Sequence, residues 1–281
     1  MAGACGMAAS EPLNAVVIGA GGRMGRALVR AAAEVPARLR VSGAAASTAS
    51  ASLGQDIGEL AGLARLDVRI TDDLAAALEG ADVVIDFSQP HATRSNLAVC
   101  RAARKPLLIG TTGFPAELSA MFEDAAREIP LLVAPNTSVG VTLLQELTRI
   151  AAKALSADLF DIEIIEAHHR MKKDAPSGTA LALGKAAAQG RGLPETHPKD
   201  ATRRIGERPN GDIGYAVIRG GDIVGEHTVL FAGTGEQVTL GHRATDRAIS
   251  ARGAVRAALW LASRPAGRYF MSDFLGLNSI A

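Results

Sequence analysis

The sequence predicts an α/β protein with two domains, the first built on a parallel sheet and the second an α+β domain built on a mixed sheet. In the first half, short apolar runs alternate with helical patterns, as in the βα units of a parallel sheet. In the second half, three strand-like runs follow one another across short glycine-containing connections, which indicates antiparallel pairing. With 281 residues and 48% apolar content, the chain can form one large domain or two ordinary ones.

The first βα unit carries a glycine-rich turn. An apolar run at 15–18 is followed by Gly-Ala-Gly-Gly-Arg-Met-Gly at 19–25 and by a helical pattern at 27–33. A strand, a glycine turn and a helix open a Rossmann-type dinucleotide-binding domain, in which the pyrophosphate reaches the helix N-terminus. The glycine spacing departs from the plain fingerprint, because it reads as GxGxxxG or GxxGxxG. We expect cofactor contacts from Gly19, Ala20, Gly21, Gly22, Arg23 and Met24.

The second strand is expected near 39–45 and should end beside the adenosine ribose of the cofactor. An acidic residue about 20 positions beyond the glycines ordinarily binds the 2′-hydroxyl of NAD. Here the stretch 44–50 contains neither an acidic nor a basic residue. The missing carboxylate removes a repulsion against the 2′-phosphate of NADP, to which Ser47 or Thr48 could donate. We expect the protein to use both NADH and NADPH, with a slight preference for NADPH.

Further βα units continue the first domain. Strands are expected at 82–88, 107–110 and 131–134, and a helix at 91–104. The loops that follow the last two strands begin at Gly110 and Pro135. In an open parallel sheet, ligands lie beyond the carboxyl ends of the strands, which is where both loops fall.

In the second half of the sequence, the apolar pattern predicts a helix at 141–155 and a short strand at 162–165. A polar stretch at 190–211 contains prolines and mixed charges, so it is expected to lie at the surface with His197 facing solvent. The remaining elements are three strands and a last helix, at 213–219, 223–231, 237–243 and 247–264. We interpret His227 and His242, which lie in these strands, as structural residues.

A concentrated group of proton-transfer residues lies at 166–180, between the strand at 162–165 and a helical pattern at 181–187. His168 or His169 can exchange a proton near neutral pH, because an unperturbed imidazole titrates near pH 6.5. Lys172 brings a positive charge into what we expect to be the same loop, where it could hold a carboxylate or protonate a developing anion.

The same segment ends in an expected anion-binding helix start. Ser177 is a good N-cap, and Pro176 before it suits the entry turn. Gly178 allows a ligand close to the backbone, and the free N–H groups of Gly178 and Thr179 would point at an anion. Together with the histidines and Lys172, this predicts a site that binds a carboxylate and donates a proton.

Composition limits the other function classes. A formal net charge of +1 gives no reason to expect nucleic acid or an anionic membrane as a partner. The only cysteines are Cys5 and Cys100, which suits the reducing cytoplasm, and no apolar run approaches the roughly 20 residues that span a bilayer. Residues 1–9 lack the basic segment of a signal peptide, so we expect a disordered leader or an early start codon with Met7 as the alternative.

The segment Glu-Ala-His-His-Arg-Met-Lys-Lys-Asp-Ala-Pro-Ser-Gly-Thr-Ala at 166–180 resembles the signature of the dihydrodipicolinate reductase family. The turn at 19–25 is similar to that family's GxxGRMG motif, and the similarity continues through most of the chain. The resemblance implies NAD(P)H-dependent reduction of 4-hydroxy-tetrahydrodipicolinate to tetrahydrodipicolinate, a step of lysine and diaminopimelate biosynthesis. The stretch 44–50 departs from the Glu-Arg or Asp-Arg pair that is common in the family, which leaves the choice of cofactor open.

Residue roles follow from the same resemblance. It implies that His168 is the acid/base and that Lys172 is a second proton donor. The substrate-binding residues would be His169, Ser177, Gly178 and Thr179. Further cofactor contacts, to the nicotinamide half, would come from Gly110, Thr111, Thr112, Ala134, Pro135, Asn136 and Thr137.

The resemblance also implies a domain plan and an assembly. A discontinuous dinucleotide-binding domain would comprise 12–138 and 249–281, and a substrate-binding and oligomerisation domain would comprise 139–248, with a homotetramer as the assembled form. Two alternatives are another Rossmann-type NAD(P)-dependent dehydrogenase acting on a small carbonyl substrate and a non-catalytic dinucleotide sensor. We expect no metal site, because adjacent histidines, one aspartate and no paired cysteines make a poor ligand set.

Overall fold

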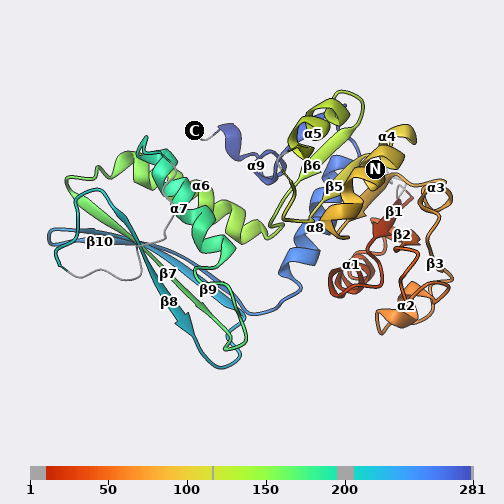
Figure 1. Ribbon diagram of the computed structural model, residues 1–281, viewed down its shortest axis with the longest axis horizontal. Coiled ribbons are helices and arrows are strands. Elements are labelled where there is room, and N and C mark those ends of the chain that lie inside the picture. The colour runs from red at the N-terminus through yellow and green to blue at the C-terminus, as the bar shows by residue number, and fades with distance from the viewer. Residues whose placement is uncertain (1–10, 116, 195–205, 280–281) are drawn as a thin grey trace, which may run out of the picture. The chain divides into compact units, whose positions relative to one another are not determined.

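The computed structural model describes residues 11–115, 117–194 and 206–279, and it divides the chain into two compact units (Figure 1). The first unit contains the chain up to Pro135 together with Ala251–Phe270, and the second contains Asn136–Ser250 and the chain from Met271 onward. The expectations for residues 1–9 and for His197 lie outside the described residues. No described helix combines the length and the apolar character needed to cross a membrane.

The first unit is built on a seven-stranded sheet of order β11-β6-β5-β4-β1-β2-β3. Every pairing in it is parallel, which confirms the predicted Rossmann-type arrangement. The strands are β1 Leu13–Ile18, β2 Leu39–Ala45, β3 Ile70–Thr71, β4 Val83–Asp86, β5 Leu107–Ile109, β6 Pro130–Val133 and β11 Gly267–Tyr269. The helices are α1 Arg23–Ala33, α2 Ile57–Leu60, α3 Leu74–Ala77, η1 Pro90–Ala92, α4 Thr93–Ala102, α5 Leu118–Ala126 and α8 Ile249–Leu261.

Helices α4 and α5 cover one face of this sheet. Leu97 and Cys100 of α4 and Phe122 of α5 pack in one cluster with strand residues such as Val84 and Leu107. Side chains alternate along a strand, so Ile85 and its equivalents point to the opposite face. Both faces are therefore buried, and this explains why the strands read as continuous apolar runs.

Backbone conformation and close packing explain why glycine occurs in the turn at 19–25. Gly19 adopts a φ of +79°, which favours glycine, and a Cβ there would lie 2.6 Å from the carbonyl oxygen of Phe87. A Cβ on Gly25 would collide with the carbonyl oxygens of Gly19 and Ala20, so glycine allows α1 to pack closely against the turn. Gly22 is the N-cap of α1, and no described side chain caps this helix. Its first backbone N–H groups are thus left for a ligand.

The second unit contains a four-stranded mixed sheet of order β10-β9-β7-β8. Strand β7 is central, parallel to β8 and antiparallel to β9. Helices α6 and α7 lie together on one face of the sheet (Figure 1), and their apolar residues share a core with Ile164, Tyr215 and Phe231. The elements are α6 Val139–Ala154, β7 Phe160–His168, α7 Gly178–Gly190, β8 Ile213–Arg219, β9 Gly225–Gly233, β10 Gln237–Ala244, α9 Met271–Phe274 and η2 Leu277–Ser279.

One predicted pairing in this sheet is wrong. The glycine connection at 220–221 indicated that the strands on either side of it pair, but β7 lies between β8 and β9. The apolar alternation of β7, with Ile162 and Ile164 fully buried, favours the centre of the sheet. The hairpin of β9 and β10 is antiparallel, as predicted.

Candidate functional site

His168 is the last residue of β7, whereas the sequence placed it in a loop. The strand is longer than predicted because it pairs along both edges, with His168 opposite Arg219 of β8 and Ala167 opposite Glu226 of β9. The imidazole is buried, with a residue exposure of 9%. It is consequently carried by a central strand rather than by a mobile loop.

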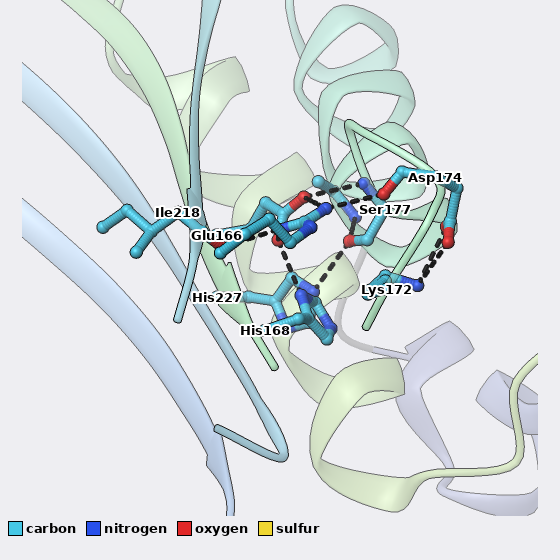
Figure 2. Close-up of polar contacts among 9 residues, drawn as sticks. Glu166, His168, Lys172, Asp174, Ser177, Ile218 and His227 are labelled. Atoms are coloured by element: carbon cyan, nitrogen blue, oxygen red, sulfur yellow. Dashed lines mark hydrogen bonds and ion pairs between the residues drawn. The ribbon is translucent and has the colours of Figure 1, made fainter. Parts of the chain in front are cut away.

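A buried carboxylate holds the imidazole. Glu166, two residues earlier on the same face of β7, is 1% exposed, and its Oε2 lies 2.6 Å from Nδ1 of His168. Arg219 donates to both carboxylate oxygens, Nη1 to Oε2 and Nη2 to Oε1, each at 2.7 Å. The backbone N–H of Ser177 donates to Oε1 at 2.9 Å. Figure 2 shows His168 and Ser177 beside Glu166.

The charges of this pair follow from its surroundings. Burial raises the pKa of Glu166, but the hydrogen bonds from Arg219, His168 and Ser177 outweigh it, so the pKa lies below its ordinary value. Burial lowers the pKa of His168, and together with the charges of Lys172 and Arg219 it outweighs the hydrogen bond and charge of Glu166, which raise the pKa. At pH 7 Glu166 is therefore ionised and His168 neutral. Nδ1 carries the proton, because a carboxylate can only accept.

The other imidazole nitrogen faces the first residue of β9. A Cβ at Gly225 would lie 3.1 Å from Nε2 of His168, so glycine at this position leaves the nitrogen room. Gly225 and His168 both line a pocket of about 210 Å³ that belongs to the second unit. Its other polar lining residues include Asn136, Thr179, His227, His242 and Arg247.

Lys172 lies in the loop after β7. Its Nζ is 2.9 Å from both carboxylate oxygens of Asp174, and this ion pair lowers the pKa of Asp174 (Figure 2). Nη2 of Arg219 donates to the backbone carbonyl of Asp174 at 2.6 Å, which ties the loop to β8. Neither Lys172 nor His169 lines the pocket. The side chain of His169 is half-buried, and its carbonyl accepts the N–H of Lys172 at 3.1 Å.

The start of α7 is arranged as predicted. Ser177 is the N-cap, and its Oγ accepts the N–H of Ala180 at 3.2 Å. Gly178 is exposed, and apart from its chain neighbours and the backbone of its own helix no described atom lies within 4 Å of where its Cβ would be. The hydroxyl of Thr179 accepts from Nδ2 of Asn136 at 3.3 Å. The open space at Gly178 suits an anion at this helix terminus.

The structure brings His227 and His242, which we interpreted as structural, to the pocket. They face each other across the β9–β10 pairing. The His227 ring packs edge-on against that of His168, with centroids 5.1 Å apart, and its Nε2 lies 3.1 Å from Oγ of Ser177. Burial lowers the pKa of His227 to about 4, with a smaller contribution from His168, so this ring is neutral at pH 7.

We expect acidification to destabilise the protein partly through His227. An unfolded histidine titrates near pH 6.5. Because the pKa of His227 is lower in the folded state, the unfolded state binds more protons between pH 6.5 and about 4. The free energy of unfolding therefore decreases as the pH is lowered across that window. Urea unfolding of the wild type and of His227→Gln at pH 7.5 and 4.5 measures the effect. Between these two pH values the free energy of unfolding of the wild type should decrease by on the order of 2 kcal/mol more than that of the variant. Equal decreases would contradict a lowered pKa for His227.

The predicted cofactor residues are distributed over both units. The glycine turn and residues 110–112, 134 and 135 lie in the first unit, whereas Asn136 and Thr137 begin the second. The glycine turn touches the loop after β2, since a Cβ on Gly21 would lie 2.6 Å from Oγ of Ser52. Gly110 has a packing reason to be small, because a Cβ there would collide with the ring of Phe87.

Three other predicted cofactor residues make hydrogen bonds to backbone groups. Thr111 donates through Oγ1 to the carbonyl of Ser88 at 3.4 Å, and the N–H of Ala134 donates to the carbonyl of Ile109 at 2.9 Å. Thr137 donates through Oγ1 to the carbonyl of Ser250 at 2.6 Å. Within the parts of the chain that the structure describes, no group of three or more His, Cys, Asp or Glu side chains could hold a metal ion.

Sequence reasoning missed Glu166 and Arg219 as site residues. Glu166 had a usable signal, because residues i and i+2 of a strand share one face and Glu166 stands two positions before His168. Arg219 had none, since its contact depends on the register between β7 and β8, which no local pattern specifies.

Comparisons with known proteins point to one family across nearly the whole chain. The family models described as dihydrodipicolinate reductase, N-terminus and C-terminus match residues 13–137 and 140–275. The 4-hydroxy-tetrahydrodipicolinate reductase of Anaeromyxobacter dehalogenans (strain 2CP-1) is 50% identical over 94% of this chain and 97% of its own. That of Alkalilimnicola ehrlichii is 52% identical over 93% of this chain and 98% of its own. Among solved structures, a dipicolinate-bound dihydrodipicolinate reductase from Paenisporosarcina sp. TG-14 has a TM-score of 0.72 and 25% identity, covering 92% of this chain and 97% of that one.

Proposed function

The chain belongs to the dihydrodipicolinate reductase family, and from that premise we propose that it performs the family's reaction at the pocket beside His168. The activity is the NAD(P)H-dependent reduction of 4-hydroxy-tetrahydrodipicolinate in lysine and diaminopimelate biosynthesis. Family membership removes the reason for the two alternatives, a different carbonyl dehydrogenase and a non-catalytic sensor. The observation that supports the location best is the buried Glu166–His168 pair, whose free imidazole nitrogen adjoins the pocket.

The pocket suits a cyclic dicarboxylate. The homologue from Paenisporosarcina binds dipicolinate, a planar ring with two carboxylates. In this chain Arg247 and Thr179 line the pocket, and the open helix start at Gly178 follows Ser177. We propose that one substrate carboxylate is bound at the start of α7, with His169 completing the substrate contacts, and the other by Arg247.

The proposed chemistry assigns proton transfer to His168 and Lys172. The 4-hydroxyl of the substrate leaves as water together with a hydrogen from the neighbouring ring carbon. Bound NAD(P)H would then supply the hydride, and negative charge would spread toward the ring nitrogen of the substrate as the hydride arrives. His168 begins neutral, and two substrate carboxylates raise the affinity of its Nε2 for a proton. Lys172 provides a compact cation and the second proton once it leaves Asp174.

A direct assay tests this function. Consumption of NADH or NADPH with freshly generated 4-hydroxy-tetrahydrodipicolinate should follow saturation kinetics, and dipicolinate should compete with the substrate. Calorimetric titration with dipicolinate, compared between the wild type and Arg247→Gln, then examines the pocket. Equal binding by both would contradict the role of Arg247.

We also propose that a discontinuous domain of 12–138 and 249–281, which includes most of the first unit, binds the cofactor, and that 139–248 binds substrate and forms a homotetramer. The uncapped start of α1 and the glycine turn support the first part. For the second, α6 and α7 cover one face of the mixed sheet, while Ile165, Ile218 and Leu230 alternate to the other face. Ile218 is 50% exposed in a single chain. Light scattering measures the assembly, and a monomer would contradict it.

A buried free thiol at Cys100 suits a cytoplasmic location.

The proposed use of both cofactors predicts the effect of a carboxylate in the loop after β2. Ser47→Asp should raise the KM for NADPH at least about tenfold relative to that for NADH, because the new charge repels the 2′-phosphate. Ser47 is exposed, so folding should be unaffected. Ser42→Asp, an exposed position five residues earlier on β2, is the matched charge control. An unchanged ratio in Ser47→Asp would place the adenosine ribose elsewhere.

A further inference from the structure

Glu166 has two contacts that serve two different parts of the site. Oε2 accepts from Nδ1 of His168 at 2.6 Å, and Oε1 accepts the N–H of Ser177 at 2.9 Å. Ser177 in turn caps α7 through its side chain. One buried carboxylate thus connects the proposed acid/base to the helix start that we propose binds substrate.

We propose that Glu166 is a positioning residue that fixes the tautomer of His168 and sets its Nε2 at a constant place relative to the start of α7. The inference rests on the proposed role of His168. Glu166 reaches the substrate only through its two partners, since it does not line the pocket. Arg219 completes the device as the counter-charge, donating to both oxygens at 2.7 Å.

The tautomer argument is a matter of donors and acceptors. An ionised carboxylate cannot donate, so Nδ1 must carry the proton and Nε2 must be the nitrogen that exchanges one. Without this partner, a neutral imidazole could place its proton on either nitrogen. A 2.6 Å contact to a charged acceptor also restricts rotation of the ring.

The burial of the ion pair between Glu166 and Arg219 points beyond a structural role. Removing two opposite charges from water costs more than packing apolar groups of the same volume, so an ion pair in a core is weak evidence for stability. The same strand offers a contrast in Glu163, which pairs with Arg208 on the opposite, partly exposed face. Glu163 is therefore a matched control: same strand, same residue type and same kind of partner, but outside the site.

Several titratable or charged groups surround His168. They come from its own strand, the following loop, β8, β9, β10 and the segment after β10: Glu166, Lys172, Arg219, His227, His242, Asp246 and Arg247. Of these, Glu166 is the group whose hydrogen bond and charge raise the His168 pKa, while Lys172 and Arg219 lower it. Loss of the carboxylate should therefore move the His168 titration to lower pH.

The test is Glu166→Gln beside Glu163→Gln, assayed as purified full-length enzyme. Glu166→Gln should reduce kcat by about 10- to 100-fold and shift the His168 resonance, observed by NMR with ¹³C-labelled histidine, to a lower midpoint. The pH dependence of kcat should contain a midpoint that is absent in His168→Gln and therefore belongs to His168. In Glu166→Gln this midpoint should also move to lower pH. Glu163 lies on the face that we propose for assembly, so light scattering first confirms that Glu163→Gln assembles like the wild type; this variant should then leave kcat and both midpoints unchanged. A Glu166→Gln enzyme with a wild-type rate and midpoint would overturn the proposal.

Glu166→Gln leaves Arg219 without its counter-charge and could fail to fold. Glu166→Gln/Arg219→Gln removes both charges, and its His168 midpoint should still lie below the wild-type value; a wild-type midpoint there would overturn the inference. If His168→Gln itself kept full turnover, the proposed function of His168 would be wrong. If only His168→Gln lost activity while both Glu166 variants kept it, the acid/base would stand and the positioning role would fall.

Discussion

Replacing His168 with glutamine is expected to lower kcat by about 10²- to 10⁴-fold, the usual contribution of a positioned general acid or base. Glutamine can still accept or donate a hydrogen bond at the end of β7, but it cannot exchange a proton near neutral pH. The residue is 9% exposed, and within the described part of the chain its side chain hydrogen-bonds to Glu166 alone, so the fold should tolerate a residue of similar length. Steady-state kinetics with saturating cofactor measures the loss.

The loss should appear in kcat and leave cofactor affinity unchanged. His169→Gln is the neighbouring comparison, because His169 is half-buried and does not line the pocket. We expect His169→Gln to act chiefly on the KM for substrate. Should the two variants lose turnover equally, the distinction between an acid/base and a binding histidine would not hold.

Local patterns were sufficient for the longer strands of the first unit and for helices α1, α4 and α8, but not for helix α5. Runs such as Val83–Asp86 and Leu107–Ile109 are short, apolar and followed by polar loops, and both faces of the sheet are buried, so each strand is visible in isolation. The shorter elements were not predicted. Strand β3 has two residues and helices α2 and α3 have four each, which is about one period of the strand or helix pattern and too short to show a repeat.

In the site, too, features set by neighbouring residues were predicted, whereas those set by strand pairing were not. The cap at Ser177 depends on neighbouring residues, and it was predicted correctly. The position of His227 against His168 depends on the pairing of β7 with β9, some 60 residues later in the chain, and no window of sequence contains it. Two histidines that read as structural were consequently the ones that the fold brings to the pocket.

Lys172→Ala is expected to reduce kcat sharply, by about 10²- to 10⁴-fold, while the affinity for NADH and NADPH stays unchanged. In the free protein Nζ is held 2.9 Å from both oxygens of Asp174, so the ammonium is kept beside the loop rather than in the pocket. A bound dicarboxylate competes with Asp174 for this cation, because it brings two negative charges. Transfer of the ammonium from Asp174 to substrate would then couple binding to proton delivery.

This exchange makes Asp174 part of the same experiment. Asp174→Asn removes one of two competing acceptors, so it should lower the KM for substrate and change kcat little. Lys173→Ala is the control for charge, since Lys173 is exposed in the same loop and should matter for neither parameter. Cofactor binding is measured by fluorescence titration and turnover by cofactor oxidation. Near wild-type turnover in Lys172→Ala would show that the second proton comes from another group, and the argument from the Lys172–Asp174 pair would fail with it.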